Sequence, residues 1–271
     1  MRIISLVSVL VLSSNFAWAT DSFIEEHNYE YNFQSVNIGT NPNSGSVVTV
    51  SDSLNLNDVN VSISGWSDSA WLSGADSGNY DKVVGAELQR IGSYGWAVRN
   101  TWEDAGSHQT IDNYGYRDYD FILLSFSEEV QLDSLNFGWA NFGNGSQEVS
   151  VSALSDNGFN KLTSANSTWS NIISDAVSSS FSIQRLSDNR GISTLDFTSS
   201  AKYWLVGAYN TIFGTVANGS GHNDAFKIAG LEFSNTTVNT PPPNTQVSEP
   251  GALALMSLGL GLVLYRRKRR V

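Results

Sequence analysis

The stretch from Tyr119 to Trp139 limits the possible folds more than any other feature of the chain. Side chains alternate between the two faces of an extended strand, so a strand with apolar residues at consecutive positions is buried on both faces. Such a run begins here, with Tyr119, Phe121 and Leu123 on one face and Ile122, Leu124 and Phe126 on the other. The parity of the apolar positions then changes after Leu132, which predicts a β-bulge or bend near Asp133-Ser134. The sequence therefore predicts a long central strand between two packed layers.

Further short strands are predicted wherever apolar and polar residues alternate between connections rich in glycine, asparagine and serine. Tyr203–Tyr209 is apolar on both faces and predicts a second central strand, and the last strand changes parity at Gly230. The turn-forming residues 188–191 predict a hairpin between their flanking strands. The other predicted strands are 29–33, 47–50, 59–63, 83–88, 94–102, 149–153, 181–186, 192–197 and 226–233.

Very little helix is expected. Only residues 167–176 are compatible with a helix, and that stretch is short and rich in serine. The polar segments 65–74 and 103–118 are predicted to be loops. About a dozen short strands joined in this way are typical of an all-β fold, and we expect an antiparallel β-sandwich of the jelly-roll type.

Composition limits both the source of stability and the kind of partner. The chain contains no cysteine, so a core without disulfides must stabilise the predicted β domain over residues 20–233. Residues 20–248 hold 25 acidic and 9 basic side chains, a net charge of −16 (9 − 25). Such a surface repels nucleic acids and anionic lipids, so no nucleic-acid partner is expected, whereas divalent cations are plausible partners.

The N-terminus has the features of a secretory signal peptide. Arg2 supplies a positive charge, residues 3–16 are mostly apolar, and Ala17-Trp18-Ala19 is a cleavage site of the small-x-small type. The alternative, a first transmembrane helix, would need a longer apolar run. We expect residues 1–19 to be removed, with cleavage before Thr20, so that the β domain is exported.

The C-terminus combines a short motif, an apolar span and a basic cluster. Residues 234–248 are rich in proline, threonine and asparagine and are predicted to be an extended linker. Its end overlaps the motif Val247, Ser248, Glu249 and Pro250, and the uncharged residues 251–265 follow. Fifteen helical residues reach about 22 Å, less than the ~30 Å hydrocarbon core, so the predicted single transmembrane span is a marginal one. The basic residues that would hold the C-terminus on the cytoplasmic side are Arg266, Arg267, Lys268, Arg269 and Arg270.

This order of features over residues 247–271 resembles the PEP-CTERM sorting signal of bacterial surface proteins. Val247, Glu249 and Pro250 match the motif of that family, and Ser248 stands in place of its first proline. The resemblance implies recognition by an exosortase-like membrane protease, after a transient single-pass stay in the inner membrane. It also implies release or attachment at the cell surface or in the extracellular polysaccharide matrix of a biofilm. Three segments of the β domain (118–139, 203–208 and 224–228) are similar to an extracellular domain common among such proteins, and they carry no catalytic residues over.

The densest polar cluster is a candidate calcium site. Asp112, Asn113, Asp118 and Asp120 place four oxygen-donating side chains within nine residues, around Gly115. Oxygen donors of this kind are the ligands that Ca²⁺ prefers, although the spacing differs from that of an EF-hand. The alternative is an aspartate-rich turn that leads into the central strand. Asn141, Asn144 and Glu148 could complete the coordination shell from the next loop.

Trp66 and Trp71 are candidate sugar-binding residues, because they lie in a segment otherwise made of small residues. Aromatic faces pack well against the apolar faces of sugar rings, and Asp68 could accept hydrogen bonds from sugar hydroxyls. The alternative is that one or both indoles pack into the domain, as large aromatic side chains usually do.

The sequence shows no pattern that is specific for catalysis. His108 lies near Glu103 and Asp104, but no Gly-x-Ser-x-Gly motif or comparable nucleophile context accompanies it. We therefore expect no enzyme, no catalytic residues and no cofactor other than calcium. The expected function is that of a non-enzymatic surface or matrix protein that binds polysaccharide or mediates adhesion. A secreted hydrolase acting on glycans and a purely structural surface protein are the alternatives.

Overall fold

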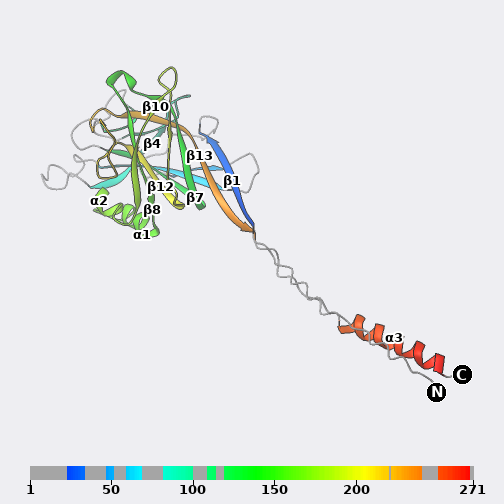
Figure 1. Cartoon of the computed structure of the whole chain (residues 1–271). Helices are drawn as coiled ribbons and strands as arrows, with labels where there is room; N and C mark the ends of the chain where they lie inside the picture. Colours follow the sequence, from blue (N-terminus) through cyan, green and yellow to red (C-terminus); the bar gives the residue numbers. More distant parts are fainter. Residues whose placement is uncertain are drawn as a thin grey trace. The chain divides into compact units, whose positions relative to one another are not determined.

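A computed structural model of the chain describes residues 23–33, 47–51, 59–68, 82–99, 109–113, 119–219, 221–239 and 250–268 (Figure 1). Residues 26–237 form one compact unit, and the C-terminal helix α3 (Pro250–Lys268) belongs to a separate unit. The predicted signal peptide, residues 1–19, lies outside the described residues, as does most of the predicted linker.

The compact unit is built almost entirely from antiparallel strands, which confirms the all-β prediction. The described residues contain thirteen strands in one hydrogen-bonded sheet, whose main path runs β1-β13-β5-β4-β3-β7-β12-β8-β9. The strands are β1 (Phe23–Asn32), β2 (Val47–Ser51), β3 (Asn60–Asp68), β4 (Val83–Arg90), β5 (Trp96–Arg99), β6 (Ile111–Asp112), β7 (Asp120–Ala140), β8 (Glu148–Leu154), β9 (Val177–Ser182), β10 (Gln184–Arg185), β11 (Gly191–Thr194), β12 (Ala201–Ala208) and β13 (Ala225–Asn239).

The predicted central strand is β7, which spans 21 residues. Its first half pairs with β3 and β12, where Leu123 lies opposite Ser64 and Leu205. Its second half pairs with β11 and β13, where Leu135 lies opposite Ser193 and Leu231. Because β13 also pairs with β5, the path through β5, β4 and β3 returns to β7 and closes the sheet.

This closure differs from the predicted β-sandwich. A sandwich has two distinct sheets, whereas the described strands belong to one sheet that closes through β7 and β13. The physical reason is the length of β7, which bonds to neighbours along its whole course. Alternation of apolar residues along separate short strands cannot reveal which strands are joined in this way.

Both predicted register changes are confirmed. Leu132 pairs with Phe233 while Ser134 pairs with Glu232, so Asp133 is the extra residue of a bulge in β7. The carbonyl of Asp133 instead accepts a hydrogen bond from the backbone of Leu195 at 2.8 Å. In β13 the register shifts between Ile228 and Gly230, at the predicted change of parity.

The two faces of β7 bury two separate hydrophobic clusters, as its pattern predicts. Ile122 and Leu124 face the larger cluster, together with Trp204 of β12. Phe121 and Leu123 face a second cluster, which lies between the sheet and the short helices α1 (Asp156–Leu162) and α2 (Trp169–Ile172). Figure 1 shows the two helices side by side near β8.

The sequence prediction missed α1 and part of the strand content. Ser155 caps α1 by accepting a hydrogen bond from the backbone of Gly158 at 3.2 Å, and the helix is too short for a clear periodic pattern. Strand β3 continues through Gly65–Asp68, the start of a predicted loop, because it pairs there with β4 and β7. Strand β6 lies in the predicted connection 103–118, and β13 continues past Phe233 to Asn239.

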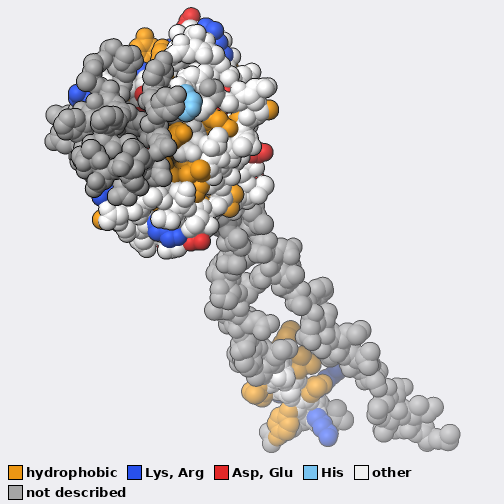
Figure 2. Space-filling view, turned by 90° about the vertical axis from the view of Figure 1, so that its left-hand side faces the viewer, with side chains coloured by type: hydrophobic (Ala, Val, Ile, Leu, Met, Phe, Trp, Pro, Cys, Tyr) orange, Lys and Arg blue, Asp and Glu red, His pale blue; other side chains and the backbone are white. Residues whose placement is uncertain are grey.

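Among the described side chains of the compact unit that are visible in Figure 2, acidic and basic groups are scattered rather than gathered into one patch.

The C-terminal helix α3 covers the predicted apolar span and ends in Arg266, Arg267 and Lys268. It starts at Pro250, and its described side chains between Met256 and Lys268 are exposed. None of the helices in the described part of the chain has the length and apolar character needed to cross a membrane. The predicted transmembrane span over 251–265 therefore forms a helix that does not meet this criterion.

Gly207 of β12 tests how tightly the second cluster is packed. A Cβ atom at this position would lie 2.3 Å from ring atoms of Phe121 and 2.4 Å from the backbone oxygen of Asp120. We expect Gly207→Ala to lower the free energy of unfolding by about 1–3 kcal/mol, as measured by urea denaturation. Gly143→Ala is the matched control, because its Cβ would meet only the Asn141 side chain at 3.6 Å. Equal stability of the two variants would show that β12 is not held against β7 as described.

Candidate functional site

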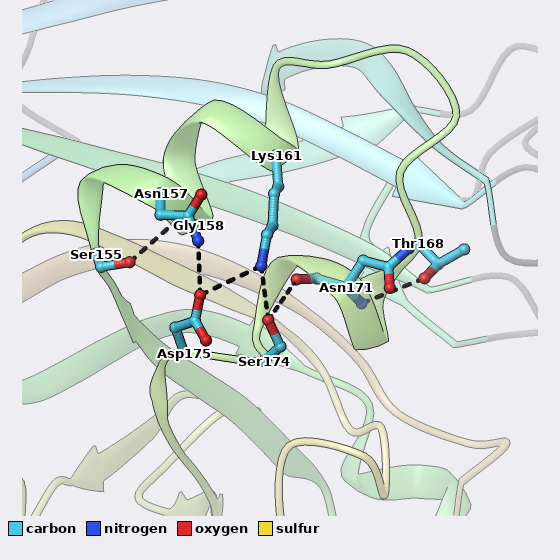
Figure 3. Close-up of polar contacts among 8 residues, drawn as sticks. All are labelled: Ser155, Asn157, Gly158, Lys161, Thr168, Asn171, Ser174 and Asp175. Carbon is cyan, nitrogen blue, oxygen red and sulfur yellow. Dashed lines mark hydrogen bonds and ion pairs between the residues drawn. The ribbon is translucent and has the colours of Figure 1, made fainter.

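A network of polar side chains fixes the helix pair that carries Trp169. Lys161 of α1 donates hydrogen bonds from its Nζ to Ser174 Oγ at 2.7 Å and to Asp175 Oδ2 at 3.3 Å (Figure 3). Asn157 Nδ2 donates to the same Asp175 oxygen at 2.6 Å. Thr168 caps α2 by accepting from the backbone of Asn171 at 3.3 Å. These contacts hold α1, α2 and the segment after them as one unit.

Trp169 is the side chain that this unit inserts into the second cluster. Its ring lies 4.4 Å from the Phe121 ring and 6.2 Å from the Phe213 ring, measured between centroids, and 2% of the residue is exposed. Its indole Nε1 is buried and has no hydrogen-bond partner among the described residues. A buried N–H group without an acceptor is costly, so this atom is an energetic cost of packing Trp169 into the second cluster.

A pocket of about 230 Å³ opens beside Trp169. We name it the Asp68 pocket, and the residues that line it are Asp68, Tyr119, Trp169, Ser170, Asn210, Thr211 and Ile212. It lies where β3 ends, where β7 begins and where the chain leaves β12, so three neighbouring strands and α2 position its walls.

The carboxylate of Asp68 is held rigidly in this pocket. Its Oδ1 accepts a hydrogen bond from the backbone N–H of Tyr119 at 2.6 Å, and the backbone N–H of Asp68 donates to the Tyr119 carbonyl at 3.4 Å. Only 1% of Asp68 is exposed. Asp68 therefore lies at the wall of the pocket with its carboxyl group held by the backbone of Tyr119.

Asn210 supplies an amide to the same pocket. Its backbone N–H donates to Ser150 Oγ at 2.9 Å, and its side-chain Oδ1 accepts from the backbone of Ile212 at 3.1 Å. These bonds fix the Asn210 side chain at the wall of the pocket. The exposed residues Thr211 and Ile212 form part of the rim.

The predicted sugar-binding residues are only partly brought together. Asp68 lines the pocket, whereas Trp66 is half-buried against the second cluster and donates from Nε1 to Ser64 Oγ at 2.9 Å. The position of Trp66 agrees with the alternative that an indole packs into the domain. Trp71 lies outside the described residues.

The predicted calcium ligands are divided between different surroundings. Asp112 accepts a hydrogen bond from the Thr110 hydroxyl, Asn113 is buried in another polar cluster, and Asp120 is buried at the start of β7. Asp118 lies outside the described residues. Among the residues that the structure describes, no group of three or more acidic or histidine side chains could hold a metal ion.

The polar cluster around Asn113 is centred on Asp224, which directly precedes β13. Asp224 Oδ2 accepts from Asn113 Nδ2 at 2.7 Å, and its Oδ1 accepts from the backbone of Glu148 at 2.6 Å. The backbone of Asp224 in turn donates to Asn113 Oδ1 at 2.9 Å. We call these three residues the Asp224 clasp, because they join the starts of β8 and β13 to the end of β6.

Burial changes the ionisation of two groups near this clasp. Removal from water, together with the neighbouring Glu148, raises the pKa of Asp224 to about 8. Removal from water also lowers the pKa of Lys227 to about 8, although Asp112 opposes the change. The Lys227 ammonium lies 4.2 Å above the Trp139 ring, a cation–π contact that favours its charged form.

The predicted sorting residues are described only in part. Val247, Ser248, Glu249, Arg269 and Arg270 lie outside the described residues. Pro250 starts α3, and Arg266, Arg267 and Lys268 end it, with all three basic side chains exposed. The helix therefore begins at the last residue of the motif.

Reasoning from sequence missed Trp169 and Asn210 as pocket residues. A usable signal for Trp169 was its position directly after Thr168, a residue type that often caps helices. Both residues lie in the only stretch of the sequence that was compatible with a helix. Asn210 directly follows the end of a strand that is apolar on both faces. Neither signal reveals that these residues meet Asp68, which is distant from both in the chain.

Comparison with known proteins gives no relative from which residue roles could be transferred. No family model matches the chain, and no curated protein or solved structure is detectably similar to it. The roles assigned to the Asp68 pocket and the Asp224 clasp therefore rest on their geometry and chemistry.

The raised pKa of Asp224 predicts that the domain loses stability as the pH rises. The folded state keeps the proton up to about pH 8, whereas the unfolded chain releases it near pH 3.8, the ordinary pKa of an aspartate side chain. The neutral carboxyl group therefore makes its full contribution to the free energy of unfolding below pH 3.8. This contribution is lost as the pH rises towards 8. We expect the urea concentration at the midpoint of unfolding to decrease as the pH is raised from 5 to 8. In the Asp224→Asn variant this decrease should be smaller.

Asp175→Asn is the control for that experiment. Its hydrogen bonds to Asn157 and Lys161 lower the pKa of exposed Asp175 below 3.8, so its contribution is constant from pH 5 to pH 8. The control should therefore keep the pH dependence of the parent protein. A parent protein whose stability rises over this interval would contradict a neutral Asp224.

Proposed function

We propose that the chain is an exported, non-enzymatic surface or extracellular-matrix protein whose β domain binds polysaccharide. Residues 1–19 would direct export, and residues 247–271 would act as a sorting signal for an exosortase-like membrane protease after a transient stay in the inner membrane. The order of motif, apolar span and basic cluster supports this proposal, as does the start of α3 at Pro250. In this role Glu249 and Pro250 are parts of a substrate.

The Asp68 pocket is the observation that supports polysaccharide binding. Its described lining includes the carboxyl group of Asp68, the amide of Asn210 and the hydroxyl groups of Tyr119, Ser170 and Thr211. Sugar rings carry hydroxyl groups that both donate and accept, so a pocket offering both kinds of partner suits them. Polar groups of this kind fix the orientation of a ligand whose apolar surface packs on the walls, here Tyr119 and Ile212.

Binding is favoured over glycan hydrolysis by the placement of the carboxylates. Glycoside hydrolysis generally uses a pair of carboxyl groups on the two sides of the scissile bond. Asp68 is the one carboxylate among the described residues that line the pocket. Asp224 and Glu148 form another carboxyl pair, and neither is among the described residues that line the pocket. Among the described residues that line the pocket, Asp68 thus has no second carboxyl group opposite it, which favours recognition over hydrolysis.

The sorting proposal predicts a shortened mature protein. We expect mass spectrometry of the surface-associated form to show that residues 1–19 and the tail beyond the motif are missing. Glu249→Ala should make the form that retains the tail accumulate, because it changes a motif residue that the protease would recognise. Glu129→Ala, an exposed change within the β domain, is the control. A surface form that still ends at Val271 would refute the sorting role.

The binding proposal predicts that two pocket substitutions weaken binding to a polysaccharide found by glycan-array screening. Asp68→Asn changes the carboxyl group at the pocket wall, and Trp169→Phe replaces the indole in the wall by a smaller ring that can still pack against Phe121. We expect each to raise the Kd about tenfold, because each changes the polar lining or the shape of the pocket. Trp66→Phe is the control, since it changes an indole outside the pocket. Unchanged binding in both pocket variants, with loss in the control, would place the site at Trp66 instead.

A further inference from the structure

A polar groove follows the outer face of β1, β13 and the second half of β7. Two hollows of about 270 Å³ and about 390 Å³ lie along this face, and Glu30 of β1 and Glu232 of β13 line both of them. The hollows are therefore neighbouring parts of one depression, which we name the β1 groove. Among the described residues, it shares no lining residue with the Asp68 pocket.

The alternation of side chains along β1 and β13 places this groove on the side of the sheet that faces away from the core. In β1, Tyr29 and Tyr31 are buried in the larger cluster, whereas the residues at the even positions from 26 to 32 are exposed. In β13, Phe233 is buried and Glu232 is exposed. The two strands lie side by side (Figure 1), and the Tyr29 ring stacks on the Phe233 ring with centroids 4.8 Å apart. Their outward faces therefore form one continuous surface.

Negative charge gathers in the β1 groove without matching positive charge. Glu26, Glu30 and Glu232 are exposed, and none of them takes part in an ion pair between described residues. An exposed glutamate is ionised at neutral pH, because water solvates its charge. Arg190 is the one basic residue among the described residues that line the groove, and it lines only the smaller hollow. The larger hollow is therefore strongly negative.

The half-buried side chain of Asp133 shows that these charges lie close together. Burial raises the pKa of Asp133, and the charges of Glu26 and Glu232 add to this increase, although hydrogen bonds from Ser234 and Gln131 oppose it. Gln131 Nε2 donates to Asp133 Oδ1 at 3.2 Å. A positively charged partner in the groove would relieve the repulsion between the carboxylates.

The length of the groove suits an extended chain better than a single ion. From Glu26 to Asn32, β1 advances by about 20 Å at ~3.3 Å per residue, and Glu26 and Glu30 are about 13 Å apart along the strand. Among the described residues, no group of three or more acidic or histidine side chains could hold a metal ion. Carboxylates spaced in this way can each meet a different positive charge of one polymer.

The remaining lining favours a polymer that carries hydroxyl groups over a basic peptide. Asn28, Gln131 and Asn136 line the groove with amides, which both donate and accept hydrogen bonds, as sugar hydroxyls do. Peptide recognition generally uses pockets for apolar side chains. Among the described lining residues, Leu186 is the one large apolar side chain that is exposed.

We propose that the β1 groove binds an extended polysaccharide whose sugar units carry protonated amines. Glu30 and Glu232 are the central contacts, because they line both hollows. Glu26 meets a further amine along the chain, and the amides hold the sugar hydroxyls. This site goes beyond the function proposed for the Asp68 pocket and does not rest on it.

Calorimetric titration with two matched oligosaccharides tests this proposal. The probes are the β-1,4-linked hexamer of glucosamine and the same hexamer with every amine acetylated. At about pH 5.5 the sugar amines are protonated and exposed glutamates remain ionised. We expect the amine form to bind at least about tenfold more tightly than the acetylated form. Added salt should weaken this binding, because contacts between exposed charges are screened.

The double variant Glu30→Gln/Glu232→Gln provides the second arm of the experiment. It removes two charges and keeps the size of both side chains, so its thermal unfolding should resemble that of the parent protein. We expect it to bind the amine form about fivefold more weakly, because each contact between exposed charges contributes modestly. Glu129→Gln is the control, since it removes the charge of an exposed glutamate that lines a different hollow. It should bind as the parent protein does.

Four results would overturn the proposal. Equal binding of the two hexamers would show that the amines are not recognised, and absence of binding of the amine form at millimolar concentration would remove the ligand. Equal losses in the double variant and the control would indicate general attraction to an acidic domain. A peptide of six lysines that binds more tightly than the amine form, and that loses affinity in the double variant, would assign the groove to a basic protein. None of these results bears on the Asp68 pocket, which its own variants test.

Discussion

Strand β7 is the constraint on which the rest of the structure depends. Its 21 residues bond to β3 and β12 along one half and to β11 and β13 along the other, so a single strand joins the parts of the sheet. The bulge at Asp133 lies in its second half, where it meets β13. In a chain without cysteine, this continuous pairing and the two clusters that it buries provide the stability that disulfides supply in many secreted domains.

The candidate site is a consequence of burying both faces of β7. The second cluster needs a cover, which α1, α2 and the segment around Phe213 provide. Trp169 anchors that cover against Phe121, and the Asp68 pocket remains where the cover meets the strand ends. The Asp224 clasp has the opposite character, because its groups satisfy one another and are closed to solvent. One buried polar set therefore joins strands within the fold, whereas the other borders a pocket.

The sequence was sufficient to predict what depends on local pattern. Alternation of apolar residues indicates the burial of both faces of β7 and β12 and the bulge at Asp133. Turn-forming residues indicate the hairpin between β10 and β11, where Asp188 and Asn189 have the positive φ angles that such turns use. Closure of the sheet depends on pairing between distant strands, which alternation does not encode. The pocket could be anticipated only at Asp68, because its partners Trp169 and Asn210 come from distant segments that tertiary packing brings together.

The account is tested most directly by the NMR signal of the Trp169 indole N–H during titration with a neutral oligosaccharide that the domain binds. We expect this signal to shift with the same saturation curve as binding, since the Trp169 ring lines the pocket and its surroundings change when a ligand enters. The Trp204 indole already donates to the Val130 carbonyl at 3.2 Å within the core, and its signal should stay in place. A Trp169 signal that does not move at saturation would contradict the assignment of the Asp68 pocket as the binding site.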